Sequence, residues 1–83
     1  MHQIKVRIFQ NSTIIVEDVD AYRSVRPDGS WHCHYNASVE DLSLFELNEK
    51  YHAQFSDGKH GDMIFNSIGS FRELNFVGLV PLT

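Results

Sequence analysis

The segment that decides the fold is Ala21–Asn36, AYRSVRPDGSWHCHYN, because it holds two candidate strands and a strong turn between them. Pro27 presets φ for the second position of a turn, and Asp-Gly at 28–29 is a typical reversal signal. Beyond the turn, successive side chains of a strand point to opposite faces. One face holds Trp31, Cys33 and Tyr35, and the other holds His32 and His34. The segment therefore predicts an antiparallel hairpin with its aromatic face buried.

The chain before this segment predicts another hairpin. Residues 3–10, QIKVRIFQ, alternate so that Ile4, Val6 and Ile8 face one way, as in a strand with one buried face. The polar stretch QNST favours a tight turn, with Asn11 tolerating positive φ. A strand rich in β-branched residues follows, and the acidic run Glu17–Asp20 interrupts its apolar pattern. We expect a bend or β-bulge at that interruption.

The chain after the segment holds the helical candidate, SVEDLSLFELNEKY. Ser38 and Asp41 form an imperfect capping box, which predicts one to three helical turns within residues 39–49. Strand alternation then returns, and a second Asp-Gly reversal at 57–58 makes a further hairpin. Pro81 is expected to end the last strand. In the strand before the Asp-Gly turn at 57–58, one face holds Tyr51, Ala53 and Phe55, and the other holds His52 and Gln54.

Size and pattern together predict the fold class. A chain of 83 residues is one β-rich domain spanning residues 1–83. One Trp, three Tyr and six Phe supply enough large apolar surface for a core. About six strands and one short helix predict an all-β or β-dominated α+β fold. The architecture we expect is a small, strongly bent antiparallel barrel or sandwich, with the helix capping an open end or linking hairpins.

Charge and composition exclude several classes of protein. Seven Lys and Arg face eleven Asp and Glu, for a net charge of -4, and the basic residues are scattered. Nucleic-acid binding is not expected, because it needs clustered basic residues. The first residues, MHQIKVRIFQNS, lack an apolar signal region, and no apolar run approaches the roughly 18 residues of a membrane span. We therefore expect a soluble cytoplasmic protein, with Cys33 as a buried, inert thiol.

Histidines provide a candidate metal site. His32 and His34 lie two apart on one strand face, with Cα atoms roughly 6.5–7 Å apart, so both imidazoles could bind one ion. Zinc is the candidate ion, with His52 as a third ligand and His60 as a fourth. The competing interpretation is a strand whose outer face carries solvated histidines, since the chain has neither Cys-x-x-Cys nor His-Glu-x-x-His.

Three functions compete at this point. The leading prediction is a non-enzymatic binding or interaction domain that self-associates as a symmetric dimer, since a short, aromatic-rich β domain has edges to protect. The alternative is a small-molecule-binding barrel with an aromatic-lined pocket. Catalysis would require at least two of His32, Cys33, His34, His52 and an acidic residue to converge in a cleft, and no catalytic signature is present. The pocket candidates are Trp31, Tyr35, Tyr51 and Phe55.

Overall fold

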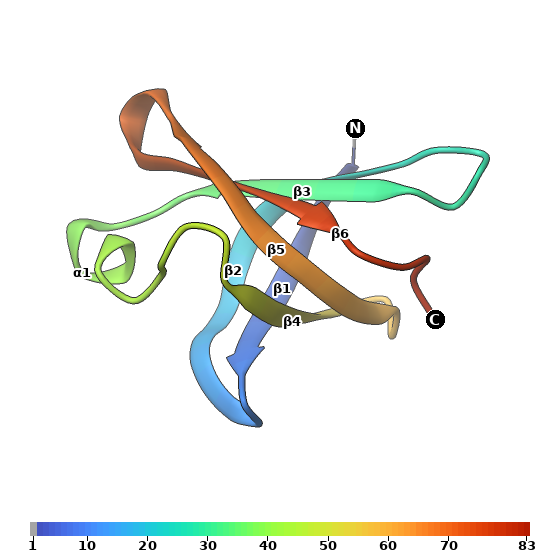
Figure 1. Ribbon diagram of the computed structural model, residues 1–83, viewed down its shortest axis with the longest axis horizontal. Helices are drawn as coiled ribbons and strands as arrows, with labels where there is room; N and C mark the ends of the chain where they lie inside the picture. Colours follow the sequence, from blue (N-terminus) through green and yellow to red (C-terminus); the bar gives the residue numbers. More distant parts are fainter. Residues whose placement is uncertain (1) are drawn as a thin grey trace.

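The computed structural model describes residues 2–83 and is a closed antiparallel barrel with strand order β1-β2-β3-β6-β5-β4 (Figure 1). This confirms the predicted β-dominated fold with one short helix. The strands are β1 His2–Gln10, β2 Thr13–Val25, β3 Trp31–Asn36, β4 Lys50–Phe55, β5 His60–Gly69 and β6 Glu73–Gly78. The helix α1 spans Val39–Leu42, and the 3-10 turn η1 spans Ser70–Arg72.

The strand connections follow a Greek key. β1, β2 and β3 form a meander, and β4 then crosses to lie beside β1, which gives the spatial order 4-1-2-3. The pairing of β3 with β6 closes the barrel, with Cys33 opposite Phe76 and Tyr35 opposite Leu74. Closure of the barrel corrects one premise of the predicted self-association, namely that the sheet has open edges to protect. Each strand has a neighbour on both sides, so open edges are not a general feature of this sheet.

One stretch of edge remains on β2. This strand pairs with β3 only over Tyr22–Val25, so Thr13–Ala21 has a strand partner on the β1 side alone. The register there jumps from Val6–Val19 to Ile8–Val16, which is the predicted bulge, and Asp18 has φ 50. Acidic side chains and bulges both discourage further strand pairing. The acidic run that interrupts the sequence pattern therefore protects the exposed part of β2.

The predicted turns have the conformations that their residues favour. Asn11 and Ser12 both have positive φ, at 52 and 68, and they join β1 to β2 in a two-residue turn. Gly29 and Gly58 each have φ 91 in the two Asp-Gly turns. Only glycine adopts that backbone conformation without a steric penalty. These three turns confirm the predicted hairpins β1–β2, β2–β3 and β4–β5.

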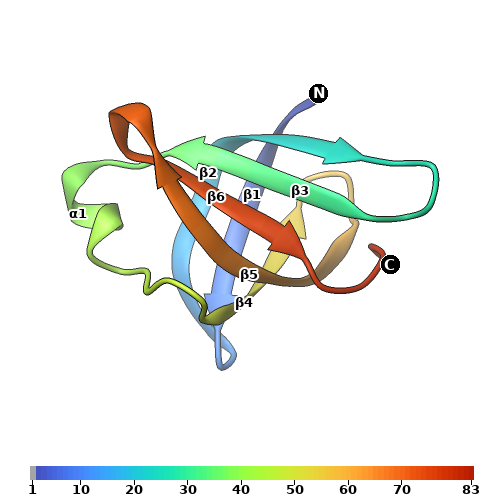
Figure 2. The same cartoon turned by 45° about the horizontal axis from the view of Figure 1, so that its top comes forward.

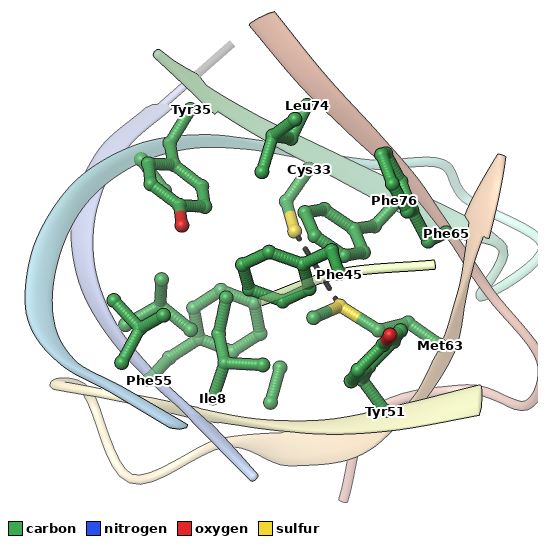
Figure 3. Packing of buried hydrophobic residues seen from close by; sticks show 14 of the residues in the cluster. Ile8, Cys33, Tyr35, Phe45, Tyr51, Phe55, Met63, Phe65, Leu74 and Phe76 are labelled. Atoms are coloured by element: carbon green, nitrogen blue, oxygen red, sulfur yellow. Dashed lines mark hydrogen bonds between the residues drawn. The ribbon is translucent and has the colours of Figure 1, made fainter. Parts of the chain in front are cut away.

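The inward faces of all six strands meet in one filled core (Figure 3). Each predicted buried face is confirmed, including the Trp31, Cys33 and Tyr35 face of β3. Phe45 enters one end of the barrel and packs on rings from several strands; these are Tyr35, Tyr51, Phe65 and Phe76. Short α1 precedes this residue, with the Ser38 hydroxyl accepting a hydrogen bond from the Asp41 N–H as predicted. The helical segment thus serves to place Phe45 as a plug.

The C-terminal residues cover the other end of the barrel. The Trp31 indole N–H donates to the Val80 carbonyl at 2.8 Å, and Leu82 packs partly against the core. Thr83 exchanges two backbone hydrogen bonds of 3.0 Å with His60. β6 itself ends at Gly78, shortly before the predicted stop at Pro81. Both ends of the barrel are therefore occupied by the chain itself.

Candidate functional site

The four predicted pocket residues lie in the filled core. Trp31, Tyr35, Tyr51 and Phe55 are each at most 3% exposed. Trp31 packs edge-on against Phe55, with ring centroids 5.7 Å apart, and Tyr35 stacks parallel to Phe76. Among them Tyr51 also borders an outer surface depression, described below. The structure thus uses these aromatic rings as packing, and it does not gather the four around an opening to solvent.

Tyr35 is unusual within this core. Its hydroxyl points into the barrel interior and has no hydrogen-bond partner within residues 2–83 (Figure 3). Burial, and secondarily the negative charge of Asp41, raises the pKa of this phenol. Nearby, the Cys33 Sγ lies 3.7 Å from the Met63 Sδ. Burial raises the pKa of the Cys33 thiol to about 12, so the inert cysteine expected from sequence fits its surroundings.

The three predicted metal ligands do not converge. His32 and His34 lie on β3 and His52 lies on β4, and two strands separate β3 from β4 in either direction around the barrel. The proposed three-histidine set is therefore wrong, because strand order, rather than strand face, decides which histidines meet. Across residues 2–83, no group of three or more His, Cys, Asp or Glu side chains has a metal-binding arrangement.

His34 instead has local partners on neighbouring strands. Its ring stacks on Tyr22 with centroids 5.4 Å apart and planes inclined by 23°. Its Nε2 lies 3.8 Å from a Glu73 carboxylate oxygen. These contacts follow from register, since Tyr22 on β2 lies opposite His34 and Glu73 on β6 is its diagonal neighbour. His34 therefore belongs to a surface packing cluster.

A different pair of histidines lies close together on the β4–β5 hairpin. His52 stands directly opposite Asp62, and its Nδ1 lies 2.8 Å from the Asp62 Oδ1. His60 is its diagonal neighbour on the same outer face, with ring centroids 5.3 Å apart. Phe9 on β1 approaches His52 edge-on from the other side, at 6.2 Å. This cluster joins an aromatic ring, two imidazoles and one carboxylate.

The cluster lines an open depression of about 620 Å³ on the outer surface of β1, β4 and β5. The turn between β1 and β2 forms one wall of it. Its volume falls within the range of roughly 300–1,000 Å³ typical of ligand sites. The lining residues are Phe9, Gln10, Asn11, Ser12, Lys50, Tyr51, His52, Gln54, His60 and Asp62.

A second surface feature is the tip of the β5–β6 hairpin. Phe71 is 87% exposed, the highest value among the large apolar residues of the described chain. It has φ 56 and ψ 41, and Arg72 after it also has φ 56, so two residues that are not glycine occupy the left-handed region. This conformation costs a residue with a side chain roughly 1–2 kcal/mol. An exposed aromatic ring in such a conformation needs an explanation.

Three hydrogen bonds hold the tip in place. The Asn36 side-chain amide donates to the Phe71 carbonyl at 3.1 Å, and the Arg72 Nε donates to the Ala37 carbonyl at 2.8 Å. The Ala37 N–H donates in turn to the Arg72 carbonyl at 2.9 Å. The tip is therefore fastened to the end of β3, and its ring is presented on a fixed backbone.

Other exposed apolar side chains lie near this tip. Val39 begins α1 two residues after Ala37, and Ile68 lies on β5 just before the turn; both are at least half exposed. The hairpin tip and α1 lie on the same side of the molecule in both views (Figure 2). We call Val39, Ile68 and Phe71 the Phe71 patch.

The sequence places His52 and His60 among four candidate ligands, but it predicts neither their separate pairing nor the exposed Phe71. At residues 69–71, GSF, the glycine and serine favour a turn, but the sequence gives no sign that the Phe71 ring is exposed. The His52–His60 pair was within reach of the sequence, because the Asp-Gly turn sets a register that places Gln54 opposite His60. In that register His52 and His60 are diagonal neighbours on one face of the hairpin.

Comparisons with known proteins add no family to this description. Neither the family models, nor the curated proteins, nor the solved structures yield a match to this chain. Within residues 2–83, every helix is too short to span a lipid bilayer.

Proposed function

We propose that this chain is a non-catalytic binding domain that self-associates as a symmetric dimer through the Phe71 patch. The observation that carries the proposal is the 87% exposure of Phe71 on an anchored tip. Burying a phenylalanine side chain is worth roughly 1.5–3 kcal/mol, so this ring is a large unused source of binding free energy. Aromatic anchors on pre-organised backbone are typical of interface hot spots.

The surroundings of the patch favour a second copy of the chain as the partner. Arg72 lies beside Phe71, while Glu40 and Asp41 lie in the first turn of α1. In a two-fold symmetric contact, the same patch occurs on both partners. Phe71 of one copy would then cover Val39 and Ile68 of the other, and the cationic end of each patch would face the acidic end of its partner. A patch with both signs of charge suits such self-pairing.

Small-molecule binding remains a second candidate, at a different place from the one predicted. The supporting observation is the open depression on β1, β4 and β5, with its convergent polar side chains. Its lining shares only Tyr51 with the predicted pocket residues.

Sedimentation velocity tests the proposed dimer. We expect the wild-type chain to shift from monomer toward dimer as its concentration rises to high micromolar. Phe71→Ser should remain monomeric over the same range, because it removes the anchor and leaves the barrel core unchanged. The matched control is Val77→Ser, which removes another partly exposed apolar side chain at the opposite end of β6.

Two results would contradict the proposal. One is a wild-type chain that stays monomeric at high micromolar concentration. The other is a Phe71→Ser variant that dimerises as the wild type does. Thermal melting, monitored by circular dichroism, checks that each variant is folded.

A further inference from the structure

The outer face of the β4–β5 hairpin carries an inference that is independent of self-association. His52 and His60 are diagonal neighbours there, and their rings are inclined by 48°. We propose that these two imidazoles form an open site for a borderline transition-metal ion such as Zn²⁺. The site keeps His52 and His60 of the four histidines considered from the sequence and excludes His32 and His34, which lie on β3.

The spacing of the two rings supports this assignment. A Zn–N bond is about 2.0–2.1 Å long, and the centre of an imidazole ring lies roughly 1.1 Å beyond its nitrogen. Two imidazoles on a tetrahedral ion therefore have ring centroids about 5 Å apart. The observed separation of His52 and His60 is 5.3 Å. This separation allows one nitrogen from each ring to bind a shared ion once the rings are turned toward it.

Asp62 prepares His52 for this role. An ionised carboxylate only accepts hydrogen bonds, so the contact of 2.8 Å places the imidazole proton on Nδ1. In a neutral imidazole with this tautomer, Nε2 carries the lone pair that binds a metal ion. A carboxylate that accepts from the second ring nitrogen is the usual support of a metal-binding histidine. Asp62 thus acts as a positioning residue, and the two histidines are the protein ligands.

The site has room for ligands that the protein does not supply. His60 is exposed, and its Nε2 has only a long contact of 3.4 Å to the Thr83 hydroxyl, so the ring can turn. The depression around it is open and lined by amide side chains, including Gln54 and Asn11. Two protein ligands and vacant coordination positions define an exchangeable site, which binds more weakly than a closed four-ligand site.

Calorimetric titration with Zn²⁺ in a non-coordinating buffer tests the proposal. His52→Ala and His60→Ala should each weaken Zn²⁺ binding at least about tenfold, because each removes one of two ligands. Asp62→Asn should weaken it by about 10- to 100-fold, as expected for loss of a supporting carboxylate. The matched controls His32→Ala and His34→Ala, on β3, should bind Zn²⁺ as the wild type does.

Several outcomes would overturn the proposal. These are the absence of Zn²⁺ binding by the wild type, unchanged binding by a His52→Ala/His60→Ala double variant, or equal losses in the β3 controls. Circular dichroism melts verify that the variants fold, and the histidine ring signals in NMR spectra report which imidazoles contact the ion. Zn²⁺ binding by Phe71→Ser separates this proposal from the proposed dimer, since that variant should retain it.

Discussion

At Gly78 the absence of a side chain lets the Trp31 indole lie across one end of the barrel. A Cβ atom on this residue would overlap the indole ring, whose N–H donates to the Val80 carbonyl. We expect Gly78→Ala to lower the free energy of unfolding by about 2–3 kcal/mol, because the indole must leave its position. Urea unfolding measures this loss.

The same pair permits a double-mutant test. Trp31→Ala alone should cost about 3–5 kcal/mol, as for other buried aromatic residues. In that background, Gly78→Ala should be nearly neutral, because the clash has been removed. If Gly78→Ala lowers the free energy of unfolding equally in both backgrounds, the glycine is not required because of the Trp31 ring.

Within residues 2–83, Arg23 is the one charged residue that is buried, and Asp57 is its partner. The Arg23 guanidinium lies 4.8 Å from the centre of the Phe55 ring and donates two hydrogen bonds, of 3.2 and 2.7 Å, to the Asp57 carboxylate. These hydrogen bonds hold the pKa of Asp57 at about 2, below its usual value of 3.8. A buried guanidinium requires such a partner, since an unpaired one is costly.

This pair predicts a specific dependence of stability on pH. Because the pKa of Asp57 is lower in the folded state, the stabilisation is present above about pH 4 and disappears as the pH falls toward about 2. Asp57→Asn should therefore lower the melting temperature at neutral pH, by the equivalent of about 1–2 kcal/mol for this half-exposed carboxylate. The difference from wild type should shrink in acid, and a difference that is constant with pH would contradict the assignment.

At the scale of the element, a substitution at the tip of the β5–β6 hairpin should affect stability and the proposed self-association in different ways. Phe71 has positive φ, and glycine adopts that conformation without a steric penalty. The free energy of unfolding of Phe71→Gly should therefore equal that of the wild type or exceed it by up to about 1 kcal/mol. The same variant should lose self-association. Denaturant unfolding and sedimentation measure the two effects. A clear loss of stability would mean that the ring packs on its own barrel.

Elements were predictable here where their signals are local. Each Asp-Gly turn and the Asn11 turn sets its own hairpin, and alternation in Trp31–Asn36 is enough to separate core from surface. The relation between His32 and His52 was not predictable in this way. It depends on β3 pairing with β6 and β4 pairing with β1, which joins residues far apart in the sequence. Local sequence patterns show which face of a strand a side chain lies on. Which strands lie side by side depends on pairing between residues far apart in the sequence.

At the scale of the whole molecule, closure of the barrel leaves no open interior among the described residues. Six inward faces, the Phe45 plug and the C-terminal residues together fill the interior and both ends. The aromatic residues that looked like a pocket in the sequence are the packing of this interior. Binding is therefore expected at features that the closed barrel leaves outside, namely the Phe71 patch and the depression beside His52 and His60.

A dilution series of ¹H–¹⁵N correlation spectra tests the central claim, self-association through the Phe71 patch, most directly. With increasing concentration, the account predicts shifts or broadening of the amide signals of residues 68–72 and of Val39–Leu42. Signals of β4, which pairs with residues 60–64 of β5 and not with the hairpin tip, should stay constant over the same series. Spectra that do not change with concentration, or changes centred on β4 with a silent hairpin tip, would contradict it.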